Sequence, residues 1–195
     1  MPAAEIVLAP ETAENPVLKT AAEELQKWIA AVTGVTLPIR SDGYFTKGLG
    51  GVNVLNLPSN DVNRIMIGKR LLPSYRSCRW FANAGWNEIL AKLDDRDGFA
   101  IRRDPENPRH LHVFGAKDKG TMNGVYALLE NNTDIIWARP NETLGTVYTK
   151  VEGDFSFVWG DEVVEVPDSK TRGWNISRVA PWMARNRCSI LNGGG

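Results

Sequence analysis

The spacing of apolar residues predicts a long amphipathic helix near the start of the chain. Between residues 16 and 34, apolar side chains recur every three or four positions, which places them on one face of an α-helix. Asn15 is suited to cap this helix, Pro16 to occupy its first position and Gly34 to end it. A compact apolar run at residues 5–9 comes before it and is typical of a buried strand.

Strands and helices continue to alternate up to about residue 151. Apolar runs predict strands at residues 36–40, 64–68, 98–104, 110–115, 134–140 and 145–151, and the two around "PENPR" predict a hairpin. Helical spacing recurs at residues 85–95 and after Gly120, and the glycines within residues 41–63 predict a long loop or insertion. This order predicts a mixed β-sheet with helices packed on it, in the α/β or α+β class.

The pattern changes at residue 152, so we divide the chain into an α/β domain at residues 1–151 and a second segment at residues 152–195. The second segment begins as an acidic connector without helical spacing. It continues into "WMARNR", which predicts a helical turn, and ends in "NGGG" directly after two apolar residues. We therefore expect a truncated second domain to begin here.

Composition argues against several classes of partner. Lys plus Arg equals Asp plus Glu at 23 each, so no excess charge favours nucleic acid or an anionic membrane. No apolar run approaches the roughly 18–20 residues that span a bilayer, and no signal peptide is visible. Cys78 and Cys188 form neither a disulfide framework nor a zinc pattern, and we predict that both are free thiols.

Three motifs have candidate chemistry, and each has a simpler structural interpretation. Gly115, Gly120 and Thr121 approach a phosphate-binding loop but lack the lysine after the second glycine, so they predict a tight turn with close packing. His110 and His112 share one side of a strand but lack further ligands, so we predict partly exposed histidines. The acidic "DDRD" run predicts a solvated turn. We predict no catalytic residue, metal or cofactor in this chain.

The order of the motifs resembles the non-catalytic N-terminal domain of α-glucuronidases and related β-hexosaminidase-like glycoside hydrolases. A helix ending in "TG" is followed by "IMIG", "DGFAIRRD", "GAKDKGTMNGVYALLE" and "IIWARP", within residues 3–150. The positions that carry the resemblance are Gly68, Gly98, Phe99, Ile101, Gly115, Gly120, Thr121, Gly124, Val125, Leu128, Leu129, Glu130, Trp137 and Pro140.

The resemblance implies a domain that is inactive alone and precedes a catalytic (β/α)8 barrel. The first barrel strand would lie near Arg172 and Trp174, and the paired catalytic carboxylates would lie beyond Gly195. The implied partner is the protein's own downstream catalytic domain, and the family suggests a secreted or periplasmic location.

If this chain contacts a sugar, we expect four residues of the second segment to do so: Arg172, Trp174, Trp182 and Arg185. Arginine can hold the carboxylate of a uronic acid and tryptophan can stack on a sugar ring. Alternatively, these residues pack the first barrel strand and the seam between domains. Two other functions stay open: a free-standing module that binds oligo- or polysaccharide or another partner, and a complete small enzyme with a buried titratable pair.

Overall fold

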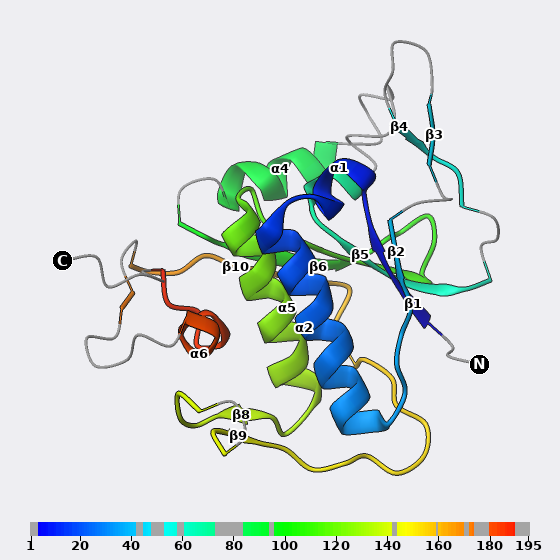
Figure 1. Cartoon of the computed structure of the whole chain (residues 1–195). Helices are drawn as coiled ribbons and strands as arrows, with labels where there is room; N and C mark the ends of the chain where they lie inside the picture. Colours follow the sequence, from blue (N-terminus) through cyan, green and yellow to red (C-terminus); the bar gives the residue numbers. More distant parts are fainter. Residues whose placement is uncertain are drawn as a thin grey trace.

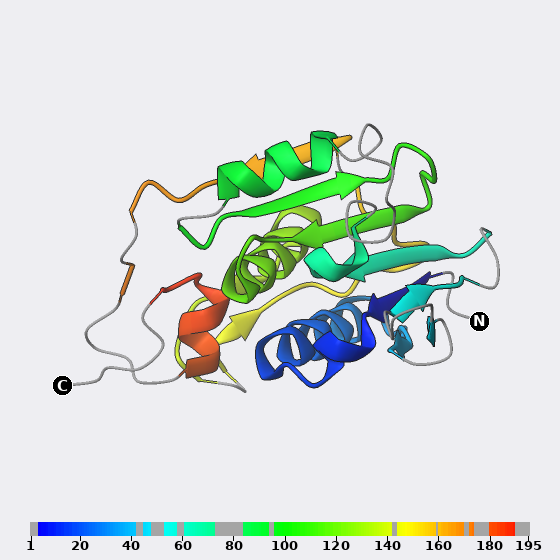
Figure 2. The ribbon, with the colours of Figure 1, turned by 90° about the horizontal axis from the view of Figure 1, so that it is seen from above.

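The computed structural model describes residues 4–41, 45–47, 53–57, 61–72, 84–93, 96–141, 144–158, 160–169, 172–173 and 180–189. Its centre is a mixed six-stranded sheet, with helices on both faces (Figures 1 and 2). The strand order is β10 (Glu162–Glu165), β6 (Phe99–Arg103), β7 (His110–Phe114), β5 (Asn63–Ile67), β1 (Ala4–Leu8) and β2 (Ile39–Arg40). Strands β7, β5, β1 and β2 run parallel, whereas β6 is antiparallel to both of its neighbours. The predicted α+β architecture is confirmed.

One face of the sheet is covered by α2 (Pro16–Thr33) and α5 (Asp118–Asn132), which lie side by side in Figure 1. The Asn15 side chain accepts hydrogen bonds from the first backbone N–H groups of α2, and Gly34 ends the helix with a φ of 73°. The apolar face of α2, which includes Leu25 and Trp28, packs with α5 and the sheet in the main core. The predicted helix and both of its ends are confirmed.

The opposite face is covered by α4 (Ala84–Leu93) and a 3₁₀ turn, η2 (Lys69–Leu71). Because strand side chains alternate, β7 directs Leu111 and Val113 to the main core and His112 and Phe114 to the α4 side. Trp86 of α4 packs edge-on against His112 and also contacts Phe114. A short helix, α1 (Pro10–Ala13), links β1 to α2.

The predicted β6–β7 hairpin is confirmed, but several other strands are shorter than the apolar runs suggest. The structure contains two small antiparallel pairs, β3 (Phe45–Lys47) with β4 (Asn53–Leu55) and β8 (Ile136–Trp137) with β9 (Thr146–Val147). The first pair corrects the expectation of a continuous loop at residues 41–63. Each residue of a strand needs a hydrogen-bonding partner on the neighbouring strand. A strand therefore ends where its neighbour ends, even if the apolar run in the sequence is longer.

The second segment contributes to the same sheet and the same core. Strand β10 pairs with the free edge of β6, with Val163 opposite Ile101. Helix α6 (Ala180–Arg185) coincides with the predicted helical turn and packs against α5. Trp174 and the expected first barrel strand around it lie outside the described residues. The domain boundary at residue 151 stays a prediction.

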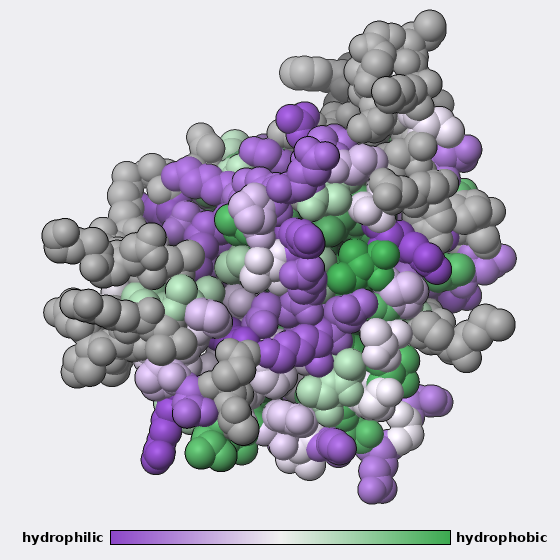
Figure 3. Space-filling view, viewed as in Figure 1, coloured by the Kyte–Doolittle hydropathy of each residue, from purple (hydrophilic) through white to green (hydrophobic). Residues whose placement is uncertain are grey.

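The surface over α2 is mostly hydrophilic, as the space-filling view shows (Figure 3). Hydrophobic residues reach the surface near β8 and β9, in the lower part of that figure. They include Ile136, 60% exposed, and Val147, 57% exposed, which are direct cross-strand partners. None of the helices that the structure describes has the length and apolar character needed to cross a bilayer.

Candidate functional site

Arg185 of α6 lies in the core, not on an open surface. Its Nε and Nη2 donate to the two carboxylate oxygens of Glu24 at 2.7 and 2.9 Å, the bidentate geometry that makes Arg–carboxylate pairs strong. The guanidinium also lies over the rings of Trp28 and Trp137, at 5.1 and 5.5 Å from their centroids. Tyr126 donates to the same carboxylate at 3.3 Å. Arg185 therefore joins α6 to α2 and β8.

Trp182 and Arg187 strengthen the same junction. The indole N–H of Trp182 donates to the Trp137 carbonyl at 2.9 Å. Arg187 donates to Glu130 of α5 at 2.6 Å and to Glu165 of β10 at 3.3 Å. Burial raises the pKa of the Glu130 carboxyl, and the Arg187 charge opposes that rise. Trp182 and Arg185 thus meet at Trp137, where their described contacts hold the C-terminal segment on the domain.

Arg172 lies elsewhere, near the carboxyl ends of the parallel strands. Its side chain donates to the backbone carbonyls of Arg187 and Ser169 at 3.1 and 2.8 Å. Its Nη2 is 4.0 Å from the Asp97 carboxylate, beside Lys119 in the first turn of α5. The structure therefore brings together Trp182 and Arg185 at Trp137, whereas Arg172 contacts the Arg187 carbonyl and directs its Nη2 toward Asp97.

The cluster around Lys119 contains buried polar atoms that are not hydrogen-bonded. Among the described parts of the chain, no hydrogen-bond partner is present for Lys119 Nζ, Asn123 Oδ1 or Arg172 Nη2. Burial lowers the pKa of Lys119 to about 8 because desolvation disfavours its ammonium form, and this outweighs the nearby Asp97 carboxylate. Asp97 itself has a φ of 54°, in the left-handed region. Buried unpaired groups of this kind are costly to stability.

The glycine motif at the start of α5 is confirmed as a packing turn. A Cβ on Gly120 would lie 2.2 Å from the Gly98 carbonyl oxygen, and one on Gly115 would lie 2.8 Å from the same atom. A Cβ on Gly124 would be 2.9 Å from Val113. The Thr121 hydroxyl accepts a hydrogen bond from the Gly115 N–H at 2.9 Å, so it closes the turn. These glycines let the helix approach the sheet closely.

The expectation of partly exposed histidines is wrong. His110 and His112 do share one side of β7, but they are 4% and 0% exposed. His110 Nε2 is 3.3 Å from Arg64, which binds Glu5 at 2.7 Å, and His112 Nε2 is 3.5 Å from Asp104. Trp86 of α4 packs over His112 and Arg64 of β5 lies against His110, and local sequence spacing reveals neither contact. The described residues include no cluster of three or more metal-binding side chains.

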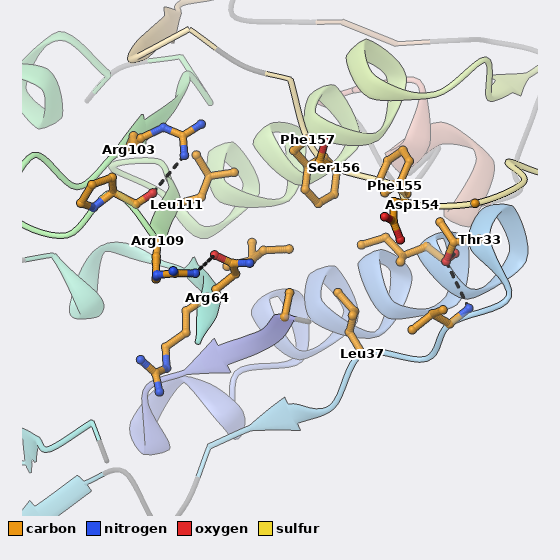
Figure 4. Close-up of a pocket in the computed structure, with 17 residues that line it drawn as sticks. Thr33, Leu37, Arg64, Arg103, Arg109, Leu111, Asp154, Phe155, Ser156 and Phe157 are labelled. Carbon is orange, nitrogen blue, oxygen red and sulfur yellow. Dashed lines mark hydrogen bonds between the residues drawn. The ribbon is translucent and has the colours of Figure 1, made fainter. Parts of the chain in front are cut away.

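A cavity of about 400 Å³ opens at the end of the sheet opposite to Lys119, beside the N-terminal ends of β1 and β5 (Figure 4). Its walls come from the C-terminal end of α2, the β6–β7 turn and residues 153–157. Arg103 and Arg109 lie at one end in Figure 4, and Phe155 and Asp154 lie toward Thr33 at the other. The cavity has the size of a small-molecule site.

Sequence reasoning missed this cavity because five separate stretches of the chain build it. The alternation in "DFSF" and the two arginines that flank "DPENP" were the signals available, and they are more than 40 positions apart. Only the folded sheet brings the "DFSF" segment and the two arginines to the same end of the sheet. By contrast, the predicted residues Trp182 and Arg185 lie in one short stretch of sequence. Their surroundings nevertheless come from α2 and β8.

The fold is similar to part of a known glycoside hydrolase. No protein-family model matches the sequence, and no curated protein matches it either. Among solved structures, the chain is similar to a family GH115 4-O-methyl-α-glucuronidase with specificity for decorated arabinogalactans, with a TM-score of 0.52 and 14% identity. The match covers 95% of this chain and 24% of that chain, so this chain spans about a quarter of its length. At this identity the similarity concerns the fold.

Proposed function

We propose that this chain is a non-catalytic domain of a carbohydrate-active glycoside hydrolase, related to α-glucuronidases, which supports a downstream catalytic barrel and is inactive alone. The fold match supports this proposal, because it covers nearly all of this chain and about a quarter of a much longer α-glucuronidase. The order of sequence motifs resembles the same family independently of the structural comparison.

The contacts between α6 and the rest of the domain are consistent with a domain that positions a catalytic barrel. Arg185 is 3% exposed and holds both oxygens of Glu24, while Arg187 links α5 and β10. A bidentate charge pair that is this buried holds α6 in one orientation against α2. A domain that supports a barrel needs such a rigid exit, because catalytic geometry tolerates little misplacement.

The apolar surface on β8 and β9 is the second support. Ile136 and Val147 are opposite one another and more than half exposed, and Leu144 in the turn between the strands is 79% exposed. Trp137, the neighbour of Ile136, is the residue that receives the Trp182 hydrogen bond. An exposed apolar group beside the exit of the chain is suited to contact a following domain.

The proposal is tested by comparing this 195-residue chain with the protein expressed from the complete reading frame. We expect only the longer protein to release a uronic acid from decorated arabinogalactan. Within it, Ile136→Asp combined with Val147→Asp should lower the melting temperature and the activity, whereas Val158→Asp, at an 82% exposed position, should change neither. Hydrolysis by the 195-residue chain alone would contradict the proposal.

A further inference from the structure

The cavity at the N-terminal ends of β1 and β5 has an apolar interior and a fixed outer wall. Its interior includes Ile29 of α2, Ile65 of β5, Leu111 of β7 and Leu37, which precedes β2. The outer wall is formed by residues 153–157, in which the rings of Phe155 and Phe157 meet edge to face at 5.2 Å. Such a surface favours a ligand with an apolar body, because it offers few partners for hydroxyl groups.

Backbone hydrogen bonds hold this wall at both ends. The Val151 N–H donates to the Val32 carbonyl at the end of α2, at 2.8 Å. The Val158 N–H donates to the Asn132 side chain at the end of α5, at 2.7 Å. The two phenylalanines therefore stand at a defined position over the cavity, and a ligand would not have to order this segment on binding.

Two arginines at one end of the cavity form no ion pair with a carboxylate of the described residues. Arg103 donates to the Pro108 carbonyl at 2.9 Å, and Arg109 is 3.5 Å from the Asn63 side-chain oxygen. Within the described ranges, no carboxylate forms an ion pair with either guanidinium. Each guanidinium has five N–H donors, so both keep donors for another group.

The other charged residues near the cavity determine which of its ends attracts an anionic group. Arg64 also lines it, but its guanidinium binds Glu5 and points away from Phe155 and Phe157 in Figure 4. Asp154 lies at the end opposite Arg103 and Arg109. An anionic group is therefore attracted to the arginine end and repelled from the Asp154 end.

We propose that this cavity binds a small organic acid, with its carboxylate at Arg103 and Arg109 and its apolar body, such as an aromatic ring, between the phenylalanines and the apolar interior. Guanidinium groups match a carboxylate with paired hydrogen bonds, and phenylalanine edges suit a second ring. This site is separate from the junction with α6 and does not depend on the proposed glycoside hydrolase function.

The test is a calorimetric titration of the 195-residue chain with four probes: 3-phenylpropionate, its neutral amide, propionate and glucuronate. We expect 3-phenylpropionate to bind at least about 10-fold more tightly than the other three, because only it has both a carboxylate charge and an apolar aromatic ring. Equal binding of the amide, no measurable binding of any probe, or tighter binding of glucuronate would overturn the proposal.

Matched variants locate the binding. Arg103→Gln combined with Arg109→Gln should weaken 3-phenylpropionate binding by about 10-fold or more. Lys92→Gln removes a positive charge from the exposed side of α4, on the other face of the sheet, and should leave the affinity unchanged. Equal affinity in the double arginine variant and the wild type would also overturn the proposal. The comparison of the four probes uses the wild type and is independent of how the variants fold.

Discussion

Replacing Lys119 by methionine should stabilise the protein. The Lys119 ammonium is buried beside Arg172 without a described hydrogen-bond partner, and its pKa is lowered from 10.5 to about 8. Each pKa unit corresponds to 1.36 kcal/mol, so burial of the charged form costs on the order of 3 kcal/mol below pH 8. Methionine has a similar length and no charge to desolvate. We expect the free energy of unfolding to rise by about 1–3 kcal/mol at pH 7, because part of the lysine stem stays in contact with water.

The pH dependence separates this explanation from improved packing. Below pH 8 both the folded and the unfolded wild type carry a protonated Lys119, so the full cost is present. Between about pH 8 and 10.5 the unfolded state binds more protons than the folded state, so wild-type stability rises with pH. The advantage of the variant should therefore shrink across this range.

The assay is urea unfolding followed by tryptophan fluorescence at several pH values. Lys92→Met, at an exposed position in α4, is the control and should change the free energy of unfolding by less than about 0.5 kcal/mol. Destabilisation by Lys119→Met at pH 7, or an advantage that is the same at pH 7 and pH 10, would refute the reasoning.

Three further predictions follow from the same contacts. Arg185→Met leaves the Glu24 carboxylate without its buried partner and should lower the free energy of unfolding by about 2–4 kcal/mol, with faster hydrogen exchange in α6; an unchanged unfolding curve would contradict this. Gly120→Ala forces the Gly98 carbonyl away and should cost about 2–3 kcal/mol in chemical unfolding, whereas Gly160→Ala, with no atom within 4 Å, should be neutral. Xylan or arabinogalactan oligosaccharides should not quench tryptophan fluorescence of the 195-residue chain, and saturable quenching would instead favour a free-standing carbohydrate-binding module.

Elements with strong local signals could be predicted from the sequence. Helix α2 has a capping asparagine, a proline at its start, a regular apolar stripe and a terminal glycine, so its bounds follow from nearby residues. The β6–β7 hairpin has clear alternation on both sides of a proline-containing turn. Strand β10 was not predicted, because its pairing with the edge of β6 depends on the tertiary fold and its four residues include two glutamates.

The candidate sites were harder to predict because burial decides their chemistry. The sequence leaves two interpretations of Trp182 and Arg185 open, sugar contacts or packing at a seam, because their environment is set by residues of α2 and β8 more than 40 positions away. Burial is the main cause of the low pKa of Lys119, and Arg172, which only the folded C-terminal segment brings close, lowers it further. Neither long-range contact has a signature in local sequence spacing.

The central claim is that this domain precedes a catalytic barrel, and the most direct test is the gene sequence beyond the codon for Gly195. We expect an open frame of several hundred further codons, with acidic residues at the ends of later barrel strands. A stop codon directly after Gly195 would contradict it and would leave a small binding or structural module.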